Sequence, residues 1–86
     1  MAPGFSAGVD RTSVDSSAIE ALGYDGSENL LEVKFRTGRV YQYFMVPNAE
    51  YERLRAAESI GAYFNREIRT RYPSREITSE ALQNLK

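Results

Sequence analysis

The stretch LLEVKFRTGRVYQY, residues 30–43, decides the fold. In its first half Leu31, Val33 and Phe35 alternate with charged residues, so they lie on one side of an extended chain. The charged residues between them then point to the opposite face, where we expect solvent. Aromatic and β-branched residues in the second half favour a second strand. The stretch therefore predicts an antiparallel hairpin with one buried face.

The connection between these strands determines where the tyrosines point. A two-residue turn would place Thr37 at positive φ, which a β-branched residue resists. A three-residue loop needs only Gly38 in that conformation, as a G1 bulge. We therefore expect Tyr41 and Tyr43 to share the buried face with Val33. A register slipped by one residue, which would turn both tyrosines to the other face, is the alternative.

The segments around the hairpin complete the expected fold. Residues 17–24 fit a helix or a strand by propensity, and the turn signal that follows them favours a strand. A helix is expected after residue 48, and a second from Ile60 to about Tyr72, capped by Ser59. The order predicts an α+β fold, a three-stranded antiparallel β-meander followed by two α-helices packed on one face.

The 86 residues suit a single domain. Residues 1–13 are small and polar, with no hydrophobic periodicity, and are expected to form a flexible N-terminal arm. We expect the domain itself to span residues 14–75. Residues 76–86 are expected to be a C-terminal tail that can form a short helix if it docks.

Composition excludes much catalytic chemistry. The chain has no Cys and no His, so it lacks disulfides, thiolate metal sites, the Cys nucleophile and the commonest general base. Lys34 is the only lysine away from the C-terminus that could act as a general base for Ser16 or Ser17. A Ser–Lys dyad is disfavoured, because Lys34 lies on a charged strand face beside Glu32 and Arg36. We expect a protein that is not an enzyme and that uses no metal and no cofactor.

The sequence contains neither a membrane-spanning run nor a signal peptide. No stretch approaches the roughly 20 apolar residues that cross a bilayer. The N-terminus lacks a basic region followed by an apolar one. We therefore expect a cytoplasmic protein without membrane contact.

Charge is distributed unevenly along the chain. The net charge is −1, but residues 34–75 hold nine basic residues against four acidic ones. Eight of those nine are Arg, which stacks on aromatic rings and donates to phosphates. A nucleic-acid contact surface is one interpretation of this pattern, a solvated face and a protein-binding face being the others. The candidate nucleic-acid-binding residues are Lys34, Arg36, Arg39, Arg66, Arg69 and Arg71.

Several short motifs occur together. They are Val14-x-Ser16-Ser17-x-Ile19, Gly23-Tyr24-Asp25, Gly38-x-x-Tyr41-x-Tyr43, Val46-Pro47, Tyr51-x-x-Leu54, Gly61-x-Tyr63-Phe64-Asn65 and Tyr72-Pro73. In combination, over about residues 14–73, they resemble the KTSC domain family. That family is named for a C-terminal appendage of some bacterial lysyl-tRNA synthetases and also occurs as small stand-alone proteins. Ala18 departs from it, because Asn is commonest there.

The resemblance implies no catalytic residue, and it implies RNA binding only by association with a synthetase. Together with the arginines, it predicts a non-catalytic module that binds RNA, either tRNA or single-stranded RNA, or another nucleic acid through an Arg-rich surface. The alternative is a protein–protein interaction module, a monomer or weak dimer that self-associates through a sheet edge.

Overall fold

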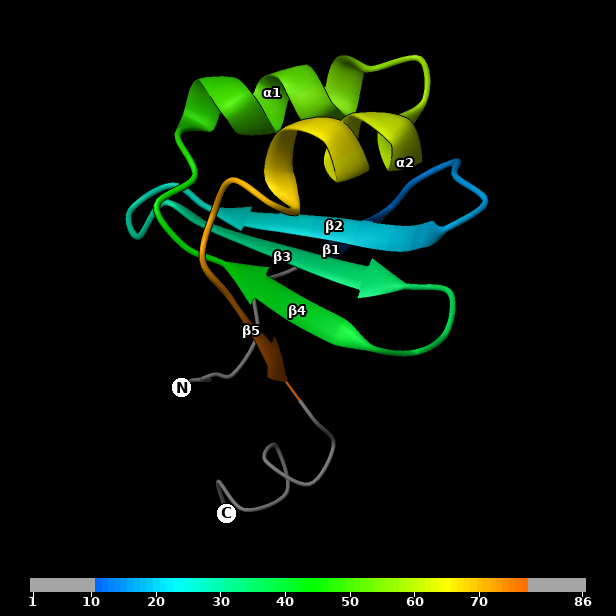
Figure 1. Ribbon diagram of the computed structural model, residues 1–86, viewed down its shortest axis with the longest axis horizontal. Helices are drawn as coiled ribbons and strands as arrows, with labels where there is room; N and C mark the ends of the chain where they lie inside the picture. The colour runs from blue at the N-terminus through cyan, green and yellow to red at the C-terminus, as the bar shows by residue number, and fades with distance from the viewer. Residues whose placement is uncertain (1–10, 78–86) are drawn as a thin grey trace.

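A five-stranded antiparallel sheet is the base of the fold (Figure 1). The computed structural model describes residues 11–77. The strands are β1 (Arg11–Ser13), β2 (Ile19–Asp25), β3 (Leu30–Phe35), β4 (Val40–Tyr43) and β5 (Ser74–Ile77). They lie side by side in chain order, so β1 and β5 are the two edges of the sheet.

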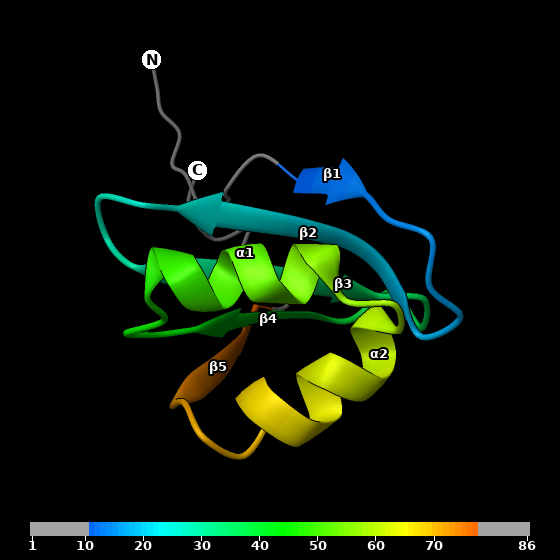
Figure 2. The same cartoon turned by 90° about the horizontal axis from the view of Figure 1, so that it is seen from above.

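The helical segments form a single layer over one face of this sheet. They are α1 (Asn48–Ala56), α2 (Ile60–Tyr63) and a π-helical continuation of α2, η2 (Phe64–Ile68). Seen from above, α1 runs along the middle of the sheet, and α2 lies towards the side of β5 (Figure 2). The expected α+β class, with helices on one face of an antiparallel meander, is confirmed.

The central hairpin has the expected three-residue connection. Gly38 adopts a φ of 97°, its N–H donates to the carbonyl of Phe35 at 2.9 Å, and the N–H of Phe35 donates to the carbonyl of Arg39 at 2.9 Å. Val33 therefore pairs with Tyr41, and Tyr43 pairs with Leu31 on the same face. The predicted register is confirmed, and both tyrosines face the helices.

The sheet has two strands more than the three expected. β1 lies within the residues assigned to a flexible arm, and it pairs with β2 so that Thr12 faces Leu22. β5 follows the helices and pairs with β4. The domain is therefore wider at both ends than residues 14–75. Glu76 and Ile77, expected in the tail, belong to β5, and the short helix expected further on lies outside the described residues.

The second helix differs from the regular α-helix expected to reach Tyr72. Its start is as expected, because the hydroxyl of Ser59 accepts the N–H of Ala62 at 3.2 Å. From Phe64 onward the turn widens, and the N–H of Arg69 donates to the carbonyl of Phe64, five residues earlier, at 2.9 Å. The buried positions are four residues apart, at Ile60, Phe64 and Ile68. A wider turn keeps side chains with that spacing on one face.

The core lies between the sheet and the helical layer. Its buried members are Ile19, Leu22, Leu31, Val33, Tyr43, Val46, Leu54, Ile60, Phe64 and Ile68. Phe35, Tyr41 and Tyr63 pack against this cluster while half-buried. The apolar faces of the strands and helices are thus the ones that the sequence pattern predicts.

The opposite face of the sheet carries a buried polar cluster. Only 1% of Glu32 is exposed, so its expected position in solvent is wrong. Its carboxylate accepts one hydrogen bond from Nη1 of Arg11 at 2.8 Å and another from Nε2 of Gln42 at 3.0 Å. These hydrogen bonds compensate for the burial of the carboxylate.

Candidate functional site

The six cations predicted to bind nucleic acid are not gathered on one face. Lys34 alternates with the core residue Val33, so it points to the sheet face away from the helices. Arg36 is two residues further along and therefore points to the same face as Lys34. Its Nε donates a hydrogen bond to the carbonyl of Ser16 at 2.7 Å. Arg66, Arg69 and Arg71 belong to η2 and the turn after it.

Four of these six cations pair with carboxylates. The pairs are Lys34 with Glu20 at 3.5 Å, Arg39 with Glu76 at 3.7 Å, Arg66 with Glu67 at 3.0 Å and Arg71 with Glu67 at 2.6 Å. The pKa of Glu67 is held below its ordinary value, mainly by the hydrogen bond from Arg66 and also by the charge of Arg71. Part of the positive charge of these cations is therefore compensated locally.

Arg69 is the exception on the helical layer. Among residues 11–77 it has no carboxylate partner. Its only side-chain hydrogen bond within that range is a long one, 3.5 Å from Nη1 to Oδ1 of Asn65. Its side chain is exposed, so its guanidinium can bind an incoming anion without first breaking an ion pair.

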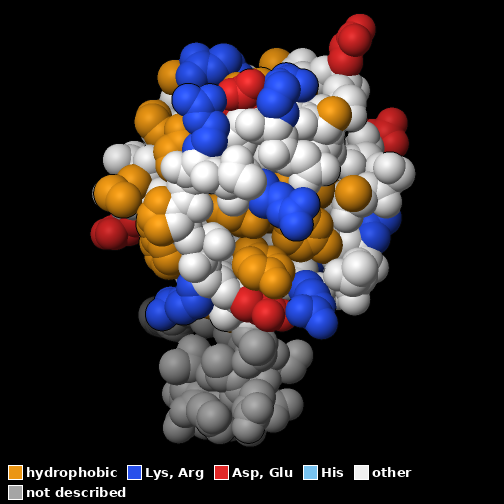
Figure 3. Space-filling model, viewed as in Figure 1, with side chains coloured by type: hydrophobic (Ala, Val, Ile, Leu, Met, Phe, Trp, Pro, Cys, Tyr) orange, Lys and Arg blue, Asp and Glu red, His pale blue; other side chains and the backbone are white. Residues whose placement is uncertain are grey.

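Arg69 borders an open groove of about 350 Å³ between η2 and the β4–β5 side of the sheet. We call it the aromatic groove; it is lined by Phe35, Tyr41, Tyr43, Phe64, Asn65, Arg69 and Ser74. The face shown in Figure 3 has hydrophobic side chains gathered over the sheet below the helices, with Lys and Arg side chains around them. The groove thus combines an apolar floor with a positive border.

Edge-to-face ring contacts hold the floor of the aromatic groove in place. The ring of Phe64 meets that of Tyr43 at 5.3 Å and 83°, and that of Phe35 at 5.5 Å and 68°. Tyr41 lies 5.8 Å from Phe35 in the same kind of contact. Phe35 and Tyr41 stay half-buried, so part of each ring is available to a ligand.

Polar groups surround this floor. Asn65 supplies an amide, Ser74 a hydroxyl, and the two tyrosines phenolic groups. Burial raises the pKa of Tyr43 above its ordinary value of 10.0, an effect that Tyr41 increases and Arg69 opposes. The Tyr43 hydroxyl therefore stays protonated near neutral pH and can donate a hydrogen bond.

Sequence reasoning missed most of this groove. It placed Phe35 and Tyr41 on the buried face, where they pack against the core, and it did not consider Asn65 or Ser74 as ligand contacts. The run Gly61-x-Tyr63-Phe64-Asn65 was a recognisable signal. Its placement beside β4 depends on the widened turn of η2, which the sequence pattern did not indicate.

The alternative chemistry considered from the sequence has structural explanations. Oγ of Ser16 accepts the N–H of Ala18 at 3.3 Å and of Ile19 at 3.2 Å, and Lys34 pairs with Glu20. Within residues 11–77 no three acidic side chains are placed to hold a metal ion. In the same part of the chain, every helix is too short or too polar to cross a bilayer.

The fold and the groove define a small α+β domain with one helical layer on an antiparallel sheet. The model of the KTSC domain family matches residues 15–72, and the chain belongs to this family. A crystal structure of a KTSC domain protein from Yersinia pestis superposes with a TM-score of 0.79 at 34% identity. The superposition covers 83% of this chain and 100% of the Yersinia pestis protein chain.

Similar proteins include short and long chains. A protein of Tsukamurella paurometabola is 44% identical over 59 residues, which are 69% of this chain and 88% of that one. A lysine–tRNA ligase of Nostoc punctiforme is 31% identical over 64 residues. That match takes in 74% of this chain but only 11% of the ligase.

Proposed function

We propose that this domain is a non-catalytic binding module for single-stranded RNA, which it contacts through the aromatic groove. The observation that carries the proposal is Arg69, a cation without a carboxylate partner among residues 11–77, beside exposed ring surface of Phe35 and Tyr41. The other bordering groups are neutral hydrogen-bonding groups.

Single-stranded RNA fits this chemistry better than a duplex does. Proteins recognise unpaired bases by stacking them on aromatic rings and by hydrogen bonding to their edges. In the aromatic groove, Tyr41 and Phe35 offer ring surface, and Asn65 offers both a donor and an acceptor. Arg69 supplies the charge for a phosphate. A paired base inside a helix cannot reach such a groove.

The names of two similar proteins motivate RNA as the partner class in this proposal. A related segment is part of proteins named lysine–tRNA ligase, which by their name act on tRNA. This chain spans 11% of the length of those proteins. Transferring an RNA partner from them to this domain is therefore part of the proposal.

Of the six cations predicted from the sequence, we assign the RNA contact to Arg69 and Arg39. Arg39 pairs with Glu76, which lies opposite Tyr41 in the sheet register. That exposed pair is weak, so a phosphate can compete for Arg39. Lys34 and Arg36 point to the other sheet face and are not assigned to this site.

Fluorescence anisotropy with a labelled single-stranded RNA, measured at several salt concentrations, tests the proposal. Each phosphate contact contributes about 0.7 to the log–log salt slope for single strands. Arg69→Gln should therefore weaken binding at low salt and reduce the slope by about 0.7. Arg55→Gln, on the side of the domain near β1, is the matched control and should bind as the parent protein does.

A protein-interaction module is the second candidate function. The carboxylate pairing of four of the six cations favours it, because a polyanion would first have to displace those carboxylates. Self-association through β1 or β5 would appear as a concentration-dependent dimer in sedimentation velocity. Absence of RNA binding together with such a dimer would favour this second candidate.

A further inference from the structure

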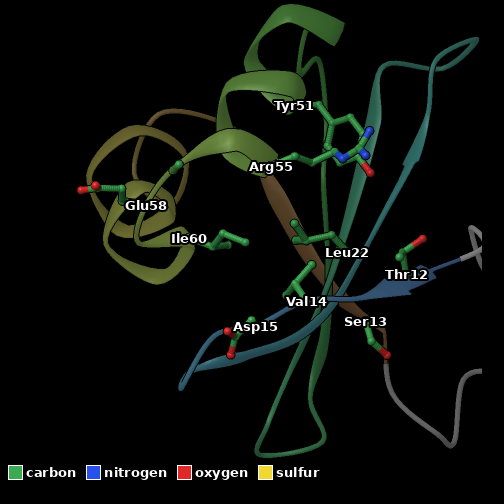
Figure 4. A pocket seen from close by; sticks show the side chains of 10 residues that line it. Thr12, Ser13, Val14, Asp15, Leu22, Tyr51, Arg55, Glu58 and Ile60 are labelled. Atoms are coloured by element: carbon green, nitrogen blue, oxygen red, sulfur yellow. The ribbon is translucent and has the colours of Figure 1, made fainter.

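A second pocket lies near the sheet edge formed by β1, across the sheet from β5. Its volume is about 520 Å³, and it is lined by Thr12, Ser13, Val14, Asp15, Leu22, Tyr51, Arg55, Ala57, Glu58 and Ile60. Figure 4 shows Val14, Leu22 and Ile60 converging in its middle. We call it the β1 pocket. Its apolar floor is open enough to receive a side chain.

Charges of opposite sign stand at separate parts of this pocket. Arg55 lies over the ring of Tyr51 at 5.5 Å, and Tyr51 stacks on Tyr24 with 4.6 Å between ring centres. This stack holds Arg55 at the α1 side, while Asp15 and Glu58 lie well apart from it (Figure 4). The α1 side therefore suits an anionic group.

The ion pair that Arg55 already makes is weak. It joins Arg55 to Glu52 at 3.6 Å, with more than half of each side chain exposed. Such solvated pairs contribute at most about 1 kcal/mol. A carboxylate from another molecule can therefore take the place of Glu52 on Arg55.

The outer edge of β1 adds backbone hydrogen-bonding groups to this site. The N–H of Val14 donates inward, to the carbonyl of Glu20 at 3.1 Å. Backbone groups alternate direction along a strand, so those of Ser13 point outward. No strand lies beyond β1 within residues 11–77. An extended peptide can pair with this edge.

We propose that the β1 edge and the β1 pocket bind an extended peptide of a partner protein as an added strand. Alternate side chains of such a strand point the same way, so residues two apart both face the pocket. One of them, aliphatic, packs on Val14 and Leu22. The other, acidic, pairs with Arg55. The site lies at the edge opposite β5, so the proposal is independent of RNA binding in the aromatic groove.

A displayed library of random ten-residue peptides tests this proposal. We expect selection on the parent domain to enrich peptides with Asp or Glu two positions from Val, Ile or Leu. Arg55→Glu should weaken the selected peptides at least tenfold, and selection on this variant should enrich Lys or Arg instead. The matched control, Arg75→Glu on β5, should select the same peptides as the parent domain.

Ser13→Pro separates strand addition from simple charge attraction. It removes the outward N–H, a substitution that an edge strand tolerates, so thermal unfolding should stay unchanged while peptide affinity falls at least tenfold. The proposal is overturned by unchanged affinity in a folded Ser13→Pro variant, by the same preference with Arg55→Glu, or by no enrichment. A stable dimer that buries the β1 edge would also overturn it, because a second copy would then be the occupant.

Discussion

Gly38 makes the central hairpin possible because its φ of 97° is one that side chains with a Cβ resist. A Cβ built there meets no other heavy atom within 4 Å, so the cost of substitution is conformational and not a clash. Gly38→Val should lower the free energy of unfolding by more than about 1 kcal/mol. Urea denaturation measures the change. Equal stability of Gly38→Val and the parent protein would contradict the register argument.

Tyr43 should make the stability of the domain depend on alkaline pH. Burial, the largest cause, raises its pKa above the ordinary value of 10.0. The protonated phenol is therefore favoured in the folded state. The stabilisation that this preference gives is complete below the pKa of Tyr43 in the unfolded chain, and it is lost as pH rises through the pKa of Tyr43 in the folded domain. We expect the free energy of unfolding to fall above about pH 10.

Tyr43→Phe isolates this effect from other titrations. The variant should lose less stability than the parent protein between pH 9 and pH 11, estimated from the ordinary tyrosine pKa of about 10. Denaturant midpoints at each pH give the comparison. If both proteins lose the same free energy over that interval, the burial of the Tyr43 hydroxyl does not govern alkaline stability.

Single residues with strong local preferences were predictable from the sequence. Thr37 and Gly38 allowed one economical turn, and that turn fixed the inward direction of Tyr41 and Tyr43. Glu32 was not predictable in this way, because alternation places it on a face without saying what covers that face. One of its hydrogen-bond partners, Arg11, is 21 positions away in the sequence.

At the scale of elements, a buried carboxylate joins the two helices. Glu50 lies in the first turn of α1 and is buried. Its carboxylate accepts hydrogen bonds from the hydroxyl of Tyr63 at 2.6 Å and from Nη2 of Arg53 at 3.3 Å. Its partner Tyr63 is 13 positions away, beyond the reach of local patterns.

Removing the Tyr63 hydroxyl should loosen the contact between α1 and α2. Tyr63→Phe removes the shortest hydrogen bond of the Glu50 carboxylate, and a hydrogen bond to a charged group contributes about 1.5–3 kcal/mol. Tyr51→Phe is the matched control, since the Tyr51 hydroxyl has no hydrogen bond to the described residues. Urea denaturation should show a larger loss for Tyr63→Phe. Equal losses would assign Glu50 no role in joining the helices.

Long periodic elements were predicted and short ones were not. β3, β4, α1 and the start of α2 carry clear apolar patterns. β1 is Arg-Thr-Ser, three exposed residues without any such pattern, and β5 has only four residues. Edge strands of this kind form because a neighbouring strand offers a backbone partner, which is information outside their own sequence.

At the scale of the whole molecule, the two sites use opposite borders of one sheet. The aromatic groove lies where η2 meets β4 and β5, and the β1 pocket lies at the other edge. The sequence showed that residues 34–75 are rich in cations, but it did not show which of these cations pair with carboxylates or on which face each one lies. Ion pairs with Glu20, Glu67 and Glu76 engage four of the six candidate cations, and such pairing depends on the tertiary fold.

The most direct test of RNA binding in the aromatic groove is a titration of the ¹⁵N-labelled domain with single-stranded RNA at low salt, followed by amide chemical shifts. We expect the largest shifts at Tyr41, Asn65 and Arg69, weaker shifts with a duplex of the same sequence, and none along β1. An unchanged spectrum, or shifts confined to the sheet face of Lys34 and Arg36, would contradict the account.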